Sequence, residues 1–460
     1  MIKKLLALVY IVFALFGIAA NAQLIAGGSD HSIFLCSDGR INSVGHNGFG
    51  QLGIGPTTFS LVTLPSTGLT GVTAISSGKY HSLFLKNDGT VWAAGKNDYG
   101  QLGDGTFVNN NTPVQVIGLT GIIAISAGGD HSLFLKNDGT VWAVGYNVYG
   151  QLGDLSFVNK SVPVQVVGLT GITSISAGGF HSLFLKNDGT AWVVGRNNYG
   201  QFGDGGNSHF NSTPIQVPGV SGVNTITAGG SFSVFLKDDG TIWTTGDNSY
   251  GQIGDGTIST VRNTPTQISN FTGVTAVDAG THHILFLKND GTVWAVGYNS
   301  GGALGDGTIV HKSSPVQVVG LTQITAVAAG SFHSFFLKSN GTIWATGNNS
   351  TAQLGDGTQV YKTIPLQITG ACNGTLGTEE NIIDKIISVY PNPCNEQLFI
   401  ELDEYQNSVC EIFNLQGQLL QITQLLTFKN MLQLNSLKNG VYLVQVKSPK
   451  GMIVKKIIKN

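Results

Sequence analysis

The feature that most constrains this chain is a block of about 50 residues that recurs seven times. The block GGDHSLFLKNDGTVWAVGYNVYGQLGD begins at Gly128, and near-copies of it run along about residues 23–370. The copies align on His31, His81, His131, His181, Phe232, His283 and His333, so that successive copies are 50, 50, 50, 51, 51 and 50 residues apart. A constant period of this length predicts repeated supersecondary units that bury their apolar surface against one another.

Each copy carries signals for four short strands. In the fourth copy, residues 172–176 alternate in polarity, residues 181–186 are mostly apolar, and residues 190–194 form a returning strand after the turn signal at 187–189. A Pro-Val-Gln-Val segment at 163–166 predicts a further strand. Four short strands per unit predict one propeller blade. We therefore expect an all-β protein with a seven-bladed β-propeller followed by a small β-sandwich.

Tryptophan is confined to one position of the repeat. The six tryptophans are Trp92, Trp142, Trp192, Trp243, Trp294 and Trp344, and Asn42 takes their place in the first copy. This restriction indicates a packing role between stacked sheets.

The two ends of the repeat array suggest how the ring closes. No Pro-x-Gln-x segment precedes the first copy, whereas residues 365–368 follow the last one. We expect residues 366–368 to complete the first blade, because a closed ring leaves no free sheet edge. Cys36 and Cys372 flank this junction, so that they either form a disulfide or remain as two free thiols.

Composition excludes several classes of protein. Glycine accounts for 64 of 460 residues, charged residues for 11%, and the formal net charge is −2. A disordered chain has low hydrophobicity and high charge, and a nucleic-acid-binding protein usually has a basic patch, so we expect neither. Residues 1–22 contain Lys3 and Lys4, an apolar run and an Ala-Asn-Ala cleavage site, which together predict a secretory signal peptide rather than a membrane anchor.

The last part of the chain has a different composition. All 18 acidic residues from Asp30 to Asp356 are aspartates, and the first glutamate is Glu379. We expect a propeller over residues 23–370, a linker over 371–385 and a separate β-sandwich over 386–460. Cys394 and Cys410 could pair within that domain, but Cys410 lies at an apolar strand position, which favours a buried thiol.

Two family resemblances follow from these motifs. The segments GGxHSLFLKNDG and GxNxYGQLG resemble the repeat of the regulator-of-chromosome-condensation family, whose members form seven-bladed propellers with diverse activities. The order YPNP, NLxGQ, NGVYLV and KKII in the tail resembles the C-terminal sorting domain of type IX secretion substrates. The second resemblance implies a Gram-negative bacterium, transport across the outer membrane through the type IX machinery and a secreted or surface location. A carbohydrate-binding-like sandwich is the alternative reading of the tail.

The sequence offers little catalytic chemistry. Six repeated histidines around a ring cannot share one metal ion, so hydrogen bonding within each blade's turn is the favoured role. The aspartates of the Gly-Asp-Gly segments stand alone between glycines, which favours a turn over a calcium site. We therefore expect no catalytic residue, no metal and no cofactor.

Nucleotide exchange on a small GTPase, the activity of the founding family members, is related to an aspartate at the first x of one GxxH segment. The residues at that position are Ser29, Lys79, Gly129, Gly179, Gly230, Thr281 and Ser331. Because none is an aspartate and no long insertion interrupts the period, we expect no small GTPase as partner. The net charge of −2 separately argues against a nucleic acid as partner.

One face of the predicted disc varies among otherwise similar repeats. The residues before the repeat histidines are Asp30, Tyr80, Asp130, Phe180, Ser231, His282 and Phe332. The residues between Gly and Asn of the GxN segments are His46, Lys96, Tyr146, Arg196, Asp247, Tyr298 and Asn348. Both sets lie at the open end of the central hairpin, so they share one face, which we call the variable face.

Aromatic residues and arginine are typical of protein interfaces. The predicted partner-binding residues are Lys79, Tyr80, Lys96, Asp130, Tyr146, Phe180, Arg196, His282, Tyr298 and Phe332. A second variable set, Phe59, Phe107, Phe157, Phe210, Arg262, His311 and Tyr361, cannot be assigned to a face from the sequence.

The favoured function is therefore binding of a protein or glycan at the cell surface. A glycan hydrolase or lyase with its site at the propeller mouth is one alternative, although only Asp30 and Asp130 approach the carboxylates that it would need. A passive structural or adhesive component is the other alternative, and drift at unconstrained loops would then explain the variable positions.

Overall fold

A computed structural model describes residues 24–36, 39–66, 68–258, 261–372, 387–391, 393–402, 408–414, 418–448 and 451–460. The predicted signal peptide (1–22) and most of the predicted linker lie outside these ranges. The chain divides into two compact units, Met1–Asn373 and Gly374–Asn460. Within the described ranges, no helix has the length and apolar character needed to span a membrane.

The first unit consists of seven four-stranded antiparallel sheets, each built from consecutive strands. The first strands of the sheets are β1 (Ile25–Gly27), β5 (Val72–Ser77), β9 (Ile122–Ala127), β13 (Ile172–Ala177), β17 (Val223–Ala228), β21 (Val274–Ala279) and β25 (Ile324–Ala329). The second strands are β2 (His31–Leu35), β6 (His81–Lys86), β10 (His131–Lys136), β14 (His181–Lys186), β18 (Phe232–Lys237), β22 (His283–Lys288) and β26 (His333–Lys338).

The outer half of each sheet follows the same order. The third strands are β3 (Ile41–His46), β7 (Val91–Gly95), β11 (Val141–Gly145), β15 (Ala191–Arg196), β19 (Ile242–Gly246), β23 (Val293–Gly297) and β27 (Ile343–Gly347). The fourth strands are β4 (Phe59–Pro65), β8 (Asn110–Gln115), β12 (Lys160–Gln165), β16 (Phe210–Gln216), β20 (Arg262–Gln267), β24 (Lys312–Gln317) and β28 (Lys362–Gln367).

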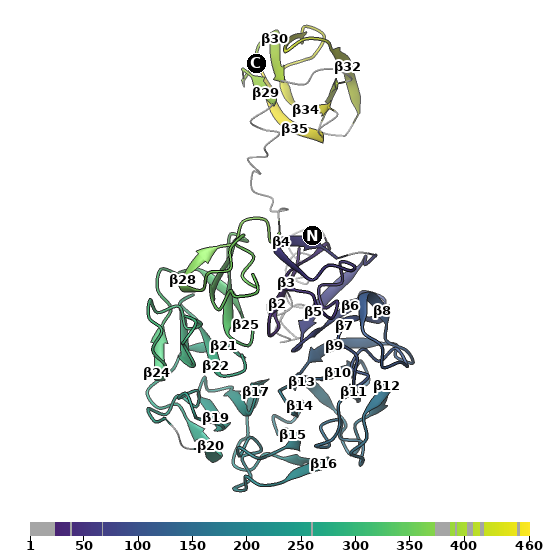
Figure 1. Cartoon of the computed structure of the whole chain (residues 1–460). Coiled ribbons are helices and arrows are strands. Elements are labelled where there is room, and N and C mark those ends of the chain that lie inside the picture. Colours follow the sequence, from purple (N-terminus) through teal and green to yellow (C-terminus); the bar gives the residue numbers. More distant parts are fainter. Residues whose placement is uncertain are drawn as a thin grey trace, which may run out of the picture. The chain divides into compact units, whose positions relative to one another are not determined.

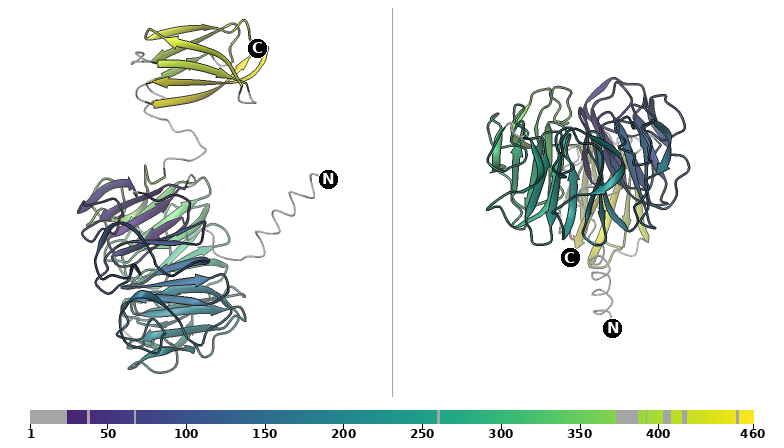
Figure 2. Two further views of the ribbon diagram at one scale, coloured as in Figure 1. Left: turned by 90° about the vertical axis from the view of Figure 1, so that its right-hand side faces the viewer. Right: turned by 90° about the horizontal axis from the view of Figure 1, so that it is seen from below.

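The seven sheets stand as blades around a central channel (Figures 1 and 2). The first strand of each blade lines the channel, and the fourth strand lies at the rim. The first blade packs against the last, because β1 contacts both β25 and β26. The predicted seven-bladed all-β propeller is thus confirmed.

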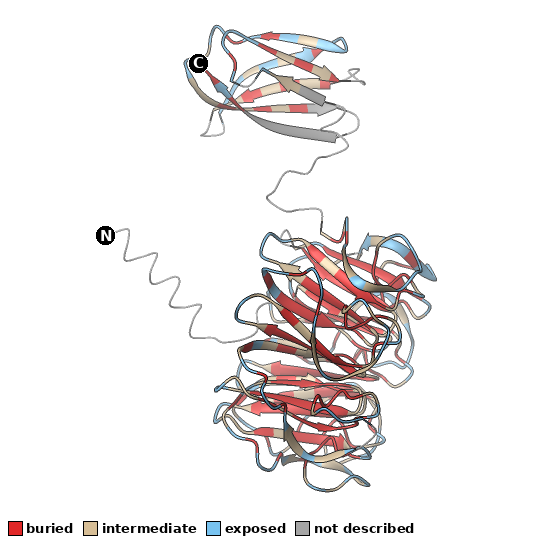
Figure 3. Cartoon of the chain, turned by 90° about the vertical axis from the view of Figure 1, so that its left-hand side faces the viewer, coloured by how far each residue is buried: buried red, intermediate tan, exposed pale blue. Residues whose placement is uncertain are grey.

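Burial explains why the sequence forms these blades. The second strand of the third copy, His131–Lys136, is buried at every position except its final lysine, because each of its faces packs against a neighbouring sheet. The second strands of the other copies are also almost entirely buried. Exposed residues concentrate in the loops and the fourth strands (Figure 3). In the Asn-Asp-Gly turn of the second blade, Asp88 Oδ1 accepts hydrogen bonds from the backbone N–H (2.9 Å) and the hydroxyl (2.6 Å) of Thr90.

The tryptophans lie between blades but are only partly buried. Trp142 packs against an apolar cluster formed mainly by the preceding blade. The Nζ of Lys136 lies 5.7 Å from the centroid of that ring, and each of the other tryptophans also has a lysine over it. The packing role is as expected, whereas the covering lysine was not anticipated.

The prediction for ring closure was wrong. Leu366 pairs with Ala345 of β27, so that residues 366 and 367 complete the seventh blade rather than the first. The first blade has its own fourth strand, β4, in which the sequence Ser-Leu-Val-Thr-Leu-Pro replaces the expected pattern. Because every blade is formed from consecutive strands, no strand is shared between the first and last blades. The ring closes by packing between these blades and by hydrogen bonds, such as that from the N–H of Ser331 to the carbonyl of Gly28 (2.9 Å).

A disulfide connects the two ends of the ring. Cys36 and Cys372 are bonded, with 336 residues of sequence separation. Beside it, Asn42 Nδ2 donates a hydrogen bond to the carbonyl of Ala371 (2.9 Å), which explains why the first copy has asparagine where the others have tryptophan. Of the two alternatives that the sequence left open, the structure has the disulfide.

The repeat histidines connect adjacent blades instead of the turns of their own blade. His81 Nε2 lies 3.0 Å from the hydroxyl of Ser132 in the next blade, and that hydroxyl donates to the carbonyl of Gln101 at 2.8 Å. Since the serine hydrogen is used by the carbonyl, the imidazole Nε2–H must be the donor to Oγ. His31, His131, His181, His283 and His333 make the same contact with the next serine, including across the junction of the last and first blades.

The fifth blade shows how this contact can be replaced. Phe232 occupies the histidine position, and Ile284 occupies the serine position of the blade that follows. Both side chains are fully buried in the same apolar cluster. The two substitutions together exchange a polar contact for an apolar one, so neither leaves an unpaired polar group behind.

We expect the substitution Phe232→His to destabilise the propeller by about 2 kcal/mol, because the imidazole N–H would face Ile284 without an acceptor. Adding Ile284→Ser is expected to recover most of that loss, and urea unfolding of the single and double variants measures the coupling. Additive effects of the two substitutions would contradict the inferred pairing.

The second unit has two packed sheets. One contains β29 (Ile387–Tyr390), β30 (Gln397–Leu402) and β33 (Lys429–Gln433), and the other contains β31 (Ser408–Phe413), β32 (Leu419–Leu425), β34 (Gly440–Ser448) and β35 (Gly451–Lys459). Residues of both sheets, such as Leu398 and Val444, share one apolar core, which confirms the predicted sandwich. Cys394 and Cys410 are buried free thiols.

Candidate functional site

A channel runs along the axis of the propeller. A cavity of about 620 Å³ is lined by the first strands of the blades, and a second cavity of about 470 Å³ is lined by the residues that follow these strands, up to the residue before the repeat histidine. Lining residues common to both cavities, such as Ala127 and Ala177, show that the second cavity is the mouth of the channel. Asp130, Phe180, Ser231, His282 and Phe332 surround this mouth. One end of the channel therefore opens at the variable face.

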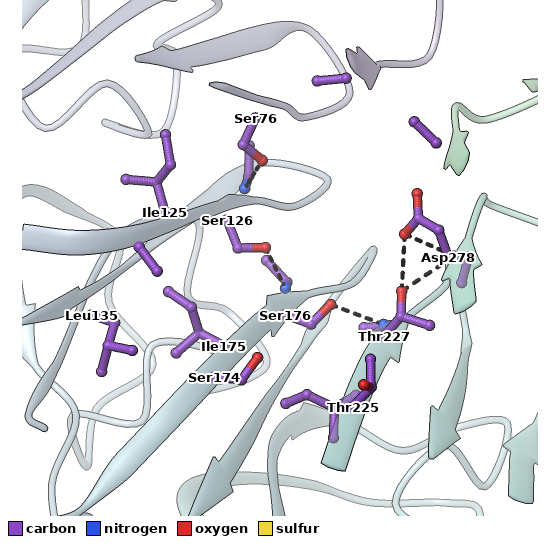
Figure 4. A pocket seen from close by; sticks show the side chains of 18 of the residues that line it. Ser76, Ile125, Ser126, Leu135, Ser174, Ile175, Ser176, Thr225, Thr227 and Asp278 are labelled. Carbon is purple, nitrogen blue, oxygen red and sulfur yellow. Dashed lines mark hydrogen bonds between the residues drawn. The ribbon is translucent and has the colours of Figure 1, made fainter. Parts of the chain in front are cut away.

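The channel wall is held by hydrogen bonds between blades (Figure 4). The hydroxyl of Ser126 accepts from the backbone N–H of Ala177 (2.9 Å), and Ser76 and Ser176 make the equivalent contact. Asp278 replaces the serine in the sixth blade, where its carboxylate accepts from the N–H of Ala329 at 2.8 Å. Burial raises the pKa of the Asp278 carboxyl to about 6. Because its hydrogen bonds are those of the wall, this residue has a structural role.

The structure pairs the two sets of predicted residues within each blade. The backbone N–H of Lys96 donates to the carbonyl of Tyr80 (2.8 Å), and that of Arg196 donates to the carbonyl of Phe180 (2.9 Å). The same bond joins His46 to Asp30, Tyr146 to Asp130, Asp247 to Ser231, Tyr298 to His282 and Asn348 to Phe332. The two sets thus lie side by side at the same end of every blade.

Side chains of the variable face also match across blade boundaries. The residue of the GxN segment in one blade faces the residue before the histidine in the next. Lys96 Nζ lies 3.1 Å from Asp130 Oδ1, and His282 Nδ1 lies 3.8 Å from Asp247 Oδ2. Ring pairs occupy three further boundaries: His46 with Tyr80, Tyr146 with Phe180, and Tyr298 with Phe332, at centroid distances of 6.3, 5.9 and 5.2 Å. Part of the variation that the sequence shows therefore reflects complementary pairing between blades.

Aromatic rings collect in three clusters on this face. The first contains His46, Phe49 and Tyr80. The second contains Tyr99, Tyr146, Tyr149, Phe180, Phe210 and Phe157. The third contains Tyr250, His282, Tyr298, His311 and Phe332. All ten predicted binding residues lie on or beside this face, with Lys79 exposed and its Nζ 5.3 Å from the centroid of the Tyr80 ring.

Sequence reasoning missed the tyrosines of the YGQ segments. Tyr99, Tyr149 and Tyr250 join the clusters, but their repetition in the sequence resembled a structural signature. The second variable set could not be placed from the sequence, whereas the structure places part of it beside the variable face. Phe210 pairs with Arg196 in the sheet, and its ring extends the second cluster toward Phe157 (5.4 Å).

Several carboxylates of the propeller already accept hydrogen bonds or form ion pairs within the protein. The Gly-Asp-Gly aspartates hold turns: Asp104 Oδ1 accepts from Asn97 Nδ2 at 3.0 Å and from the N–H of Thr106 at 2.9 Å. Asp130 is bound by Lys96. No group of three His, Cys, Asp or Glu side chains suited to a metal ion occurs within the described ranges.

Comparisons with known proteins agree with this architecture. Residues 164–383 match the model of the RCC1-like domain. Residues 88–135 and 138–185 match one model of the regulator of chromosome condensation (RCC1) repeat, and 23–51, 72–101 and 122–151 match a second. Residues 388–460 match the secretion system C-terminal sorting domain.

Three individual proteins are similar to this chain in sequence or in structure. The E3 ubiquitin-protein ligase HERC2 of Homo sapiens is 33% identical over 107 residues, which are 22% of this chain and 2% of that protein. Human WBSCR16 is 24% identical, with a TM-score of 0.61, over 66% of this chain and 83% of that one. Prp20p of Saccharomyces cerevisiae is 20% identical, with a TM-score of 0.66, over 81% and 90% of the two chains.

These likenesses to solved structures show a common fold, and the family models identify the repeats and the tail. The chain contains regulator of chromosome condensation (RCC1) repeats and an RCC1-like domain, and it ends in the sorting domain of type IX secretion substrates, which marks it as a protein exported to the cell surface of a Gram-negative bacterium.

Proposed function

We propose that this exported propeller is a binding module that recognises a protein partner through its variable face. The observation that carries the proposal is the concentration of three aromatic clusters and several cations around the mouth of the channel. Tyrosine, phenylalanine and arginine are the residues that most often anchor protein interfaces.

Side-chain contacts between neighbouring blades support this role. Ring pairs and ion pairs between blades hold the half-buried side chains in place before a partner arrives. Pre-organised side chains lose little rotamer entropy on binding, so more of the contact energy remains for affinity. A catalytic role has less support, because Asp130, one of the two carboxylates considered, is held by Lys96.

The test replaces one ring from each cluster. We expect the triple variant Tyr80→Ala/Phe180→Ala/Phe332→Ala to weaken binding of a captured partner at least about a hundredfold, since each buried aromatic anchor contributes roughly 2 kcal/mol or more. The full-length protein is used to capture proteins from host and bacterial surface extracts, and each captured protein is titrated against both forms.

A matched control tests whether a loss of affinity comes from the variable face or from the removal of exposed apolar side chains in general. Ile117 and Val319 are exposed apolar residues at strand ends away from the variable face, so Ile117→Ala/Val319→Ala is expected to leave binding unchanged. Tryptophan fluorescence during urea unfolding checks that all variants fold. Unchanged affinity in a folded triple variant would refute the proposal.

A further inference from the structure

Arg196 differs from the other charged residues of the variable face in having no carboxylate partner. At the same position of the second blade, Lys96 lies 3.1 Å from Asp130 and 3.8 Å from Asp98. No Asp or Glu among the described residues lies within ion-pair distance of Arg196. Ser231 takes the place that Asp130 has opposite Lys96. The boundary between the fourth and fifth blades therefore carries an unneutralised cation beside the channel mouth.

Three aromatic rings hold the guanidinium of Arg196. Its Cζ lies 5.1 Å from the ring centroid of Tyr149, 5.7 Å from that of Phe180 and 5.5 Å from that of Tyr199. Cation–π contacts of this kind fix a planar guanidinium without using its hydrogen-bond donors. The group is thus oriented, yet it remains free to accept a ligand.

Hydrogen-bond donors exceed acceptors around this residue. Arg196 Nε, Gln151 Nε2 and Gln201 Nε2 are buried and have no partner within the described part of the chain. Among the equivalent glutamines, Gln252 Nε2 donates to Asp247 at 3.0 Å and Gln101 Nε2 to Asp130 at 3.4 Å, whereas Gln353 Nε2 in the seventh blade also has no partner among the described residues. Within those residues, only at Arg196 does an unpartnered glutamine donor occur in the same blade as an unpartnered guanidinium nitrogen. Buried polar groups in folded proteins are usually paired, so a local surplus of donors indicates a missing acceptor.

We infer that Arg196 receives the carboxylate of an acidic side chain of the protein partner, whose neighbouring apolar residues rest on the second aromatic cluster. A carboxylate supplies acceptor oxygens in the geometry that a guanidinium matches in two parallel hydrogen bonds. This inference rests on the proposed function and identifies the chemistry that the face recognises.

A protein segment fits this surface better than an acidic polysaccharide. Recognition of sugars combines stacking on aromatic rings with many free polar side chains that bond the hydroxyl groups, and the second requirement is the one that this surface does not meet. Here the nearby asparagines are engaged in their own loops: Asn197 Oδ1 accepts from the N–H of Phe202 (2.9 Å), and its Nδ2 donates to Asp204 (3.0 Å). The surrounding surface is mainly aromatic, with Phe210 and Phe157 about half exposed (48% and 46%).

The test selects random twelve-residue peptides displayed on phage against the immobilised full-length protein. We expect enriched peptides to carry Asp or Glu beside aromatic or aliphatic residues. Arg196→Gln is expected to weaken the synthesised peptides about tenfold or more, and Arg196→Lys less, because lysine keeps the charge without the two-pronged geometry. Lys186→Gln is the matched control, with affinity expected within about twofold, because Lys186 lies 3.6 Å from Asp188 at the opposite end of the same hairpin from the variable face.

Several results would overturn the inference. These are selected peptides without acidic enrichment, acidic peptides that bind Arg196→Gln as well as the native protein, or Arg196-dependent retention of alginate with no enriched peptide. A partner that loses affinity for the triple aromatic variant but not for Arg196→Gln would refute the carboxylate site alone. A partner unaffected by the triple variant would refute the proposed function itself.

Discussion

Acidification from pH 7 to pH 5 is expected to remove most of the propeller's stability. Six repeat histidines are fully buried, and burial lowers the pKa of His31, His131, His283 and His333 to about 3 and that of His81 and His181 to about 4. The unfolded chain binds these protons near pH 6.5, so it holds up to six more than the folded protein between about pH 4 and 6.5. Stability is therefore complete above pH 6.5 and falls as the pH drops below it.

The size of the effect follows from linkage. Each imidazole lowers the free energy of unfolding by about 2 kcal/mol at pH 5, so the six together lower it by roughly 12 kcal/mol, which is comparable to the total stability of a typical domain. Asp278 acts in the opposite direction, because its folded pKa of about 6 is raised, so it adds stability as the pH falls from 6 toward 3.8. One carboxyl offsets only about 1 kcal/mol of this loss.

Urea unfolding at pH 7.5, 6.5, 5.5 and 4.5 measures this dependence, and fluorescence reports the propeller alone because all six tryptophans belong to it. The double variant His181→Phe/Ser233→Ile copies the natural Phe232 and Ile284 pair. Its pH dependence is expected to be less steep by about one proton, or 1.4 kcal/mol per pH unit. A free energy of unfolding that stays constant from pH 7 to 5 would contradict the burial of six neutral histidine side chains between the blades.

Reduction of the disulfide is the second change expected to have a large effect. The bond between Cys36 and Cys372 closes a loop of 336 residues, for which the chain-entropy relation gives about 5 to 6 kcal/mol. The disulfide also lies at the boundary between the first and last blades, where the ring closes. At this boundary Phe34 and Phe335 meet edge to face, with 5.4 Å between their ring centroids. We expect a reductant to lower the free energy of unfolding by about this amount.

The control for that experiment is the double variant Cys36→Ala/Cys372→Ala. It should show the lower stability without reductant and no further loss with it, since Cys394 and Cys410 are free thiols that a reductant leaves unchanged. Equal urea midpoints for the native protein with and without reductant would refute a stabilising role for the bond.

Most of the fold was predictable from the sequence, because each copy of the repeat can be compared with the six other copies. Strand positions and blade number followed from the period and from strictly placed residues such as His131 and Trp142. Ring closure was predicted wrongly, since β4 had lost the Pro-x-Gln-x pattern that identifies a fourth strand elsewhere. The partner of each histidine lies in the next blade, and strand patterns within one repeat carry no information about that contact.

The candidate site was predictable in position but not in detail. The open end of a hairpin must bring both variable sets together, and the backbone bond between Arg196 and Phe180 is one instance. Which residues would face each other across blades depended on the stacking of the sheets. Only that stacking shows that Lys96 is neutralised by Asp130 while Arg196 is not.

The most direct test of the account is hydrogen–deuterium exchange of the full-length protein with and without a captured partner. We expect protection in the segments that carry the variable tips, such as 146–149, 178–181 and 196–199, and none at the Asn-Asp-Gly turns at the opposite ends of the hairpins, such as 137–139 and 187–189. Protection centred on those turns, with the variable tips exchanging as in the free protein, would contradict recognition through the variable face.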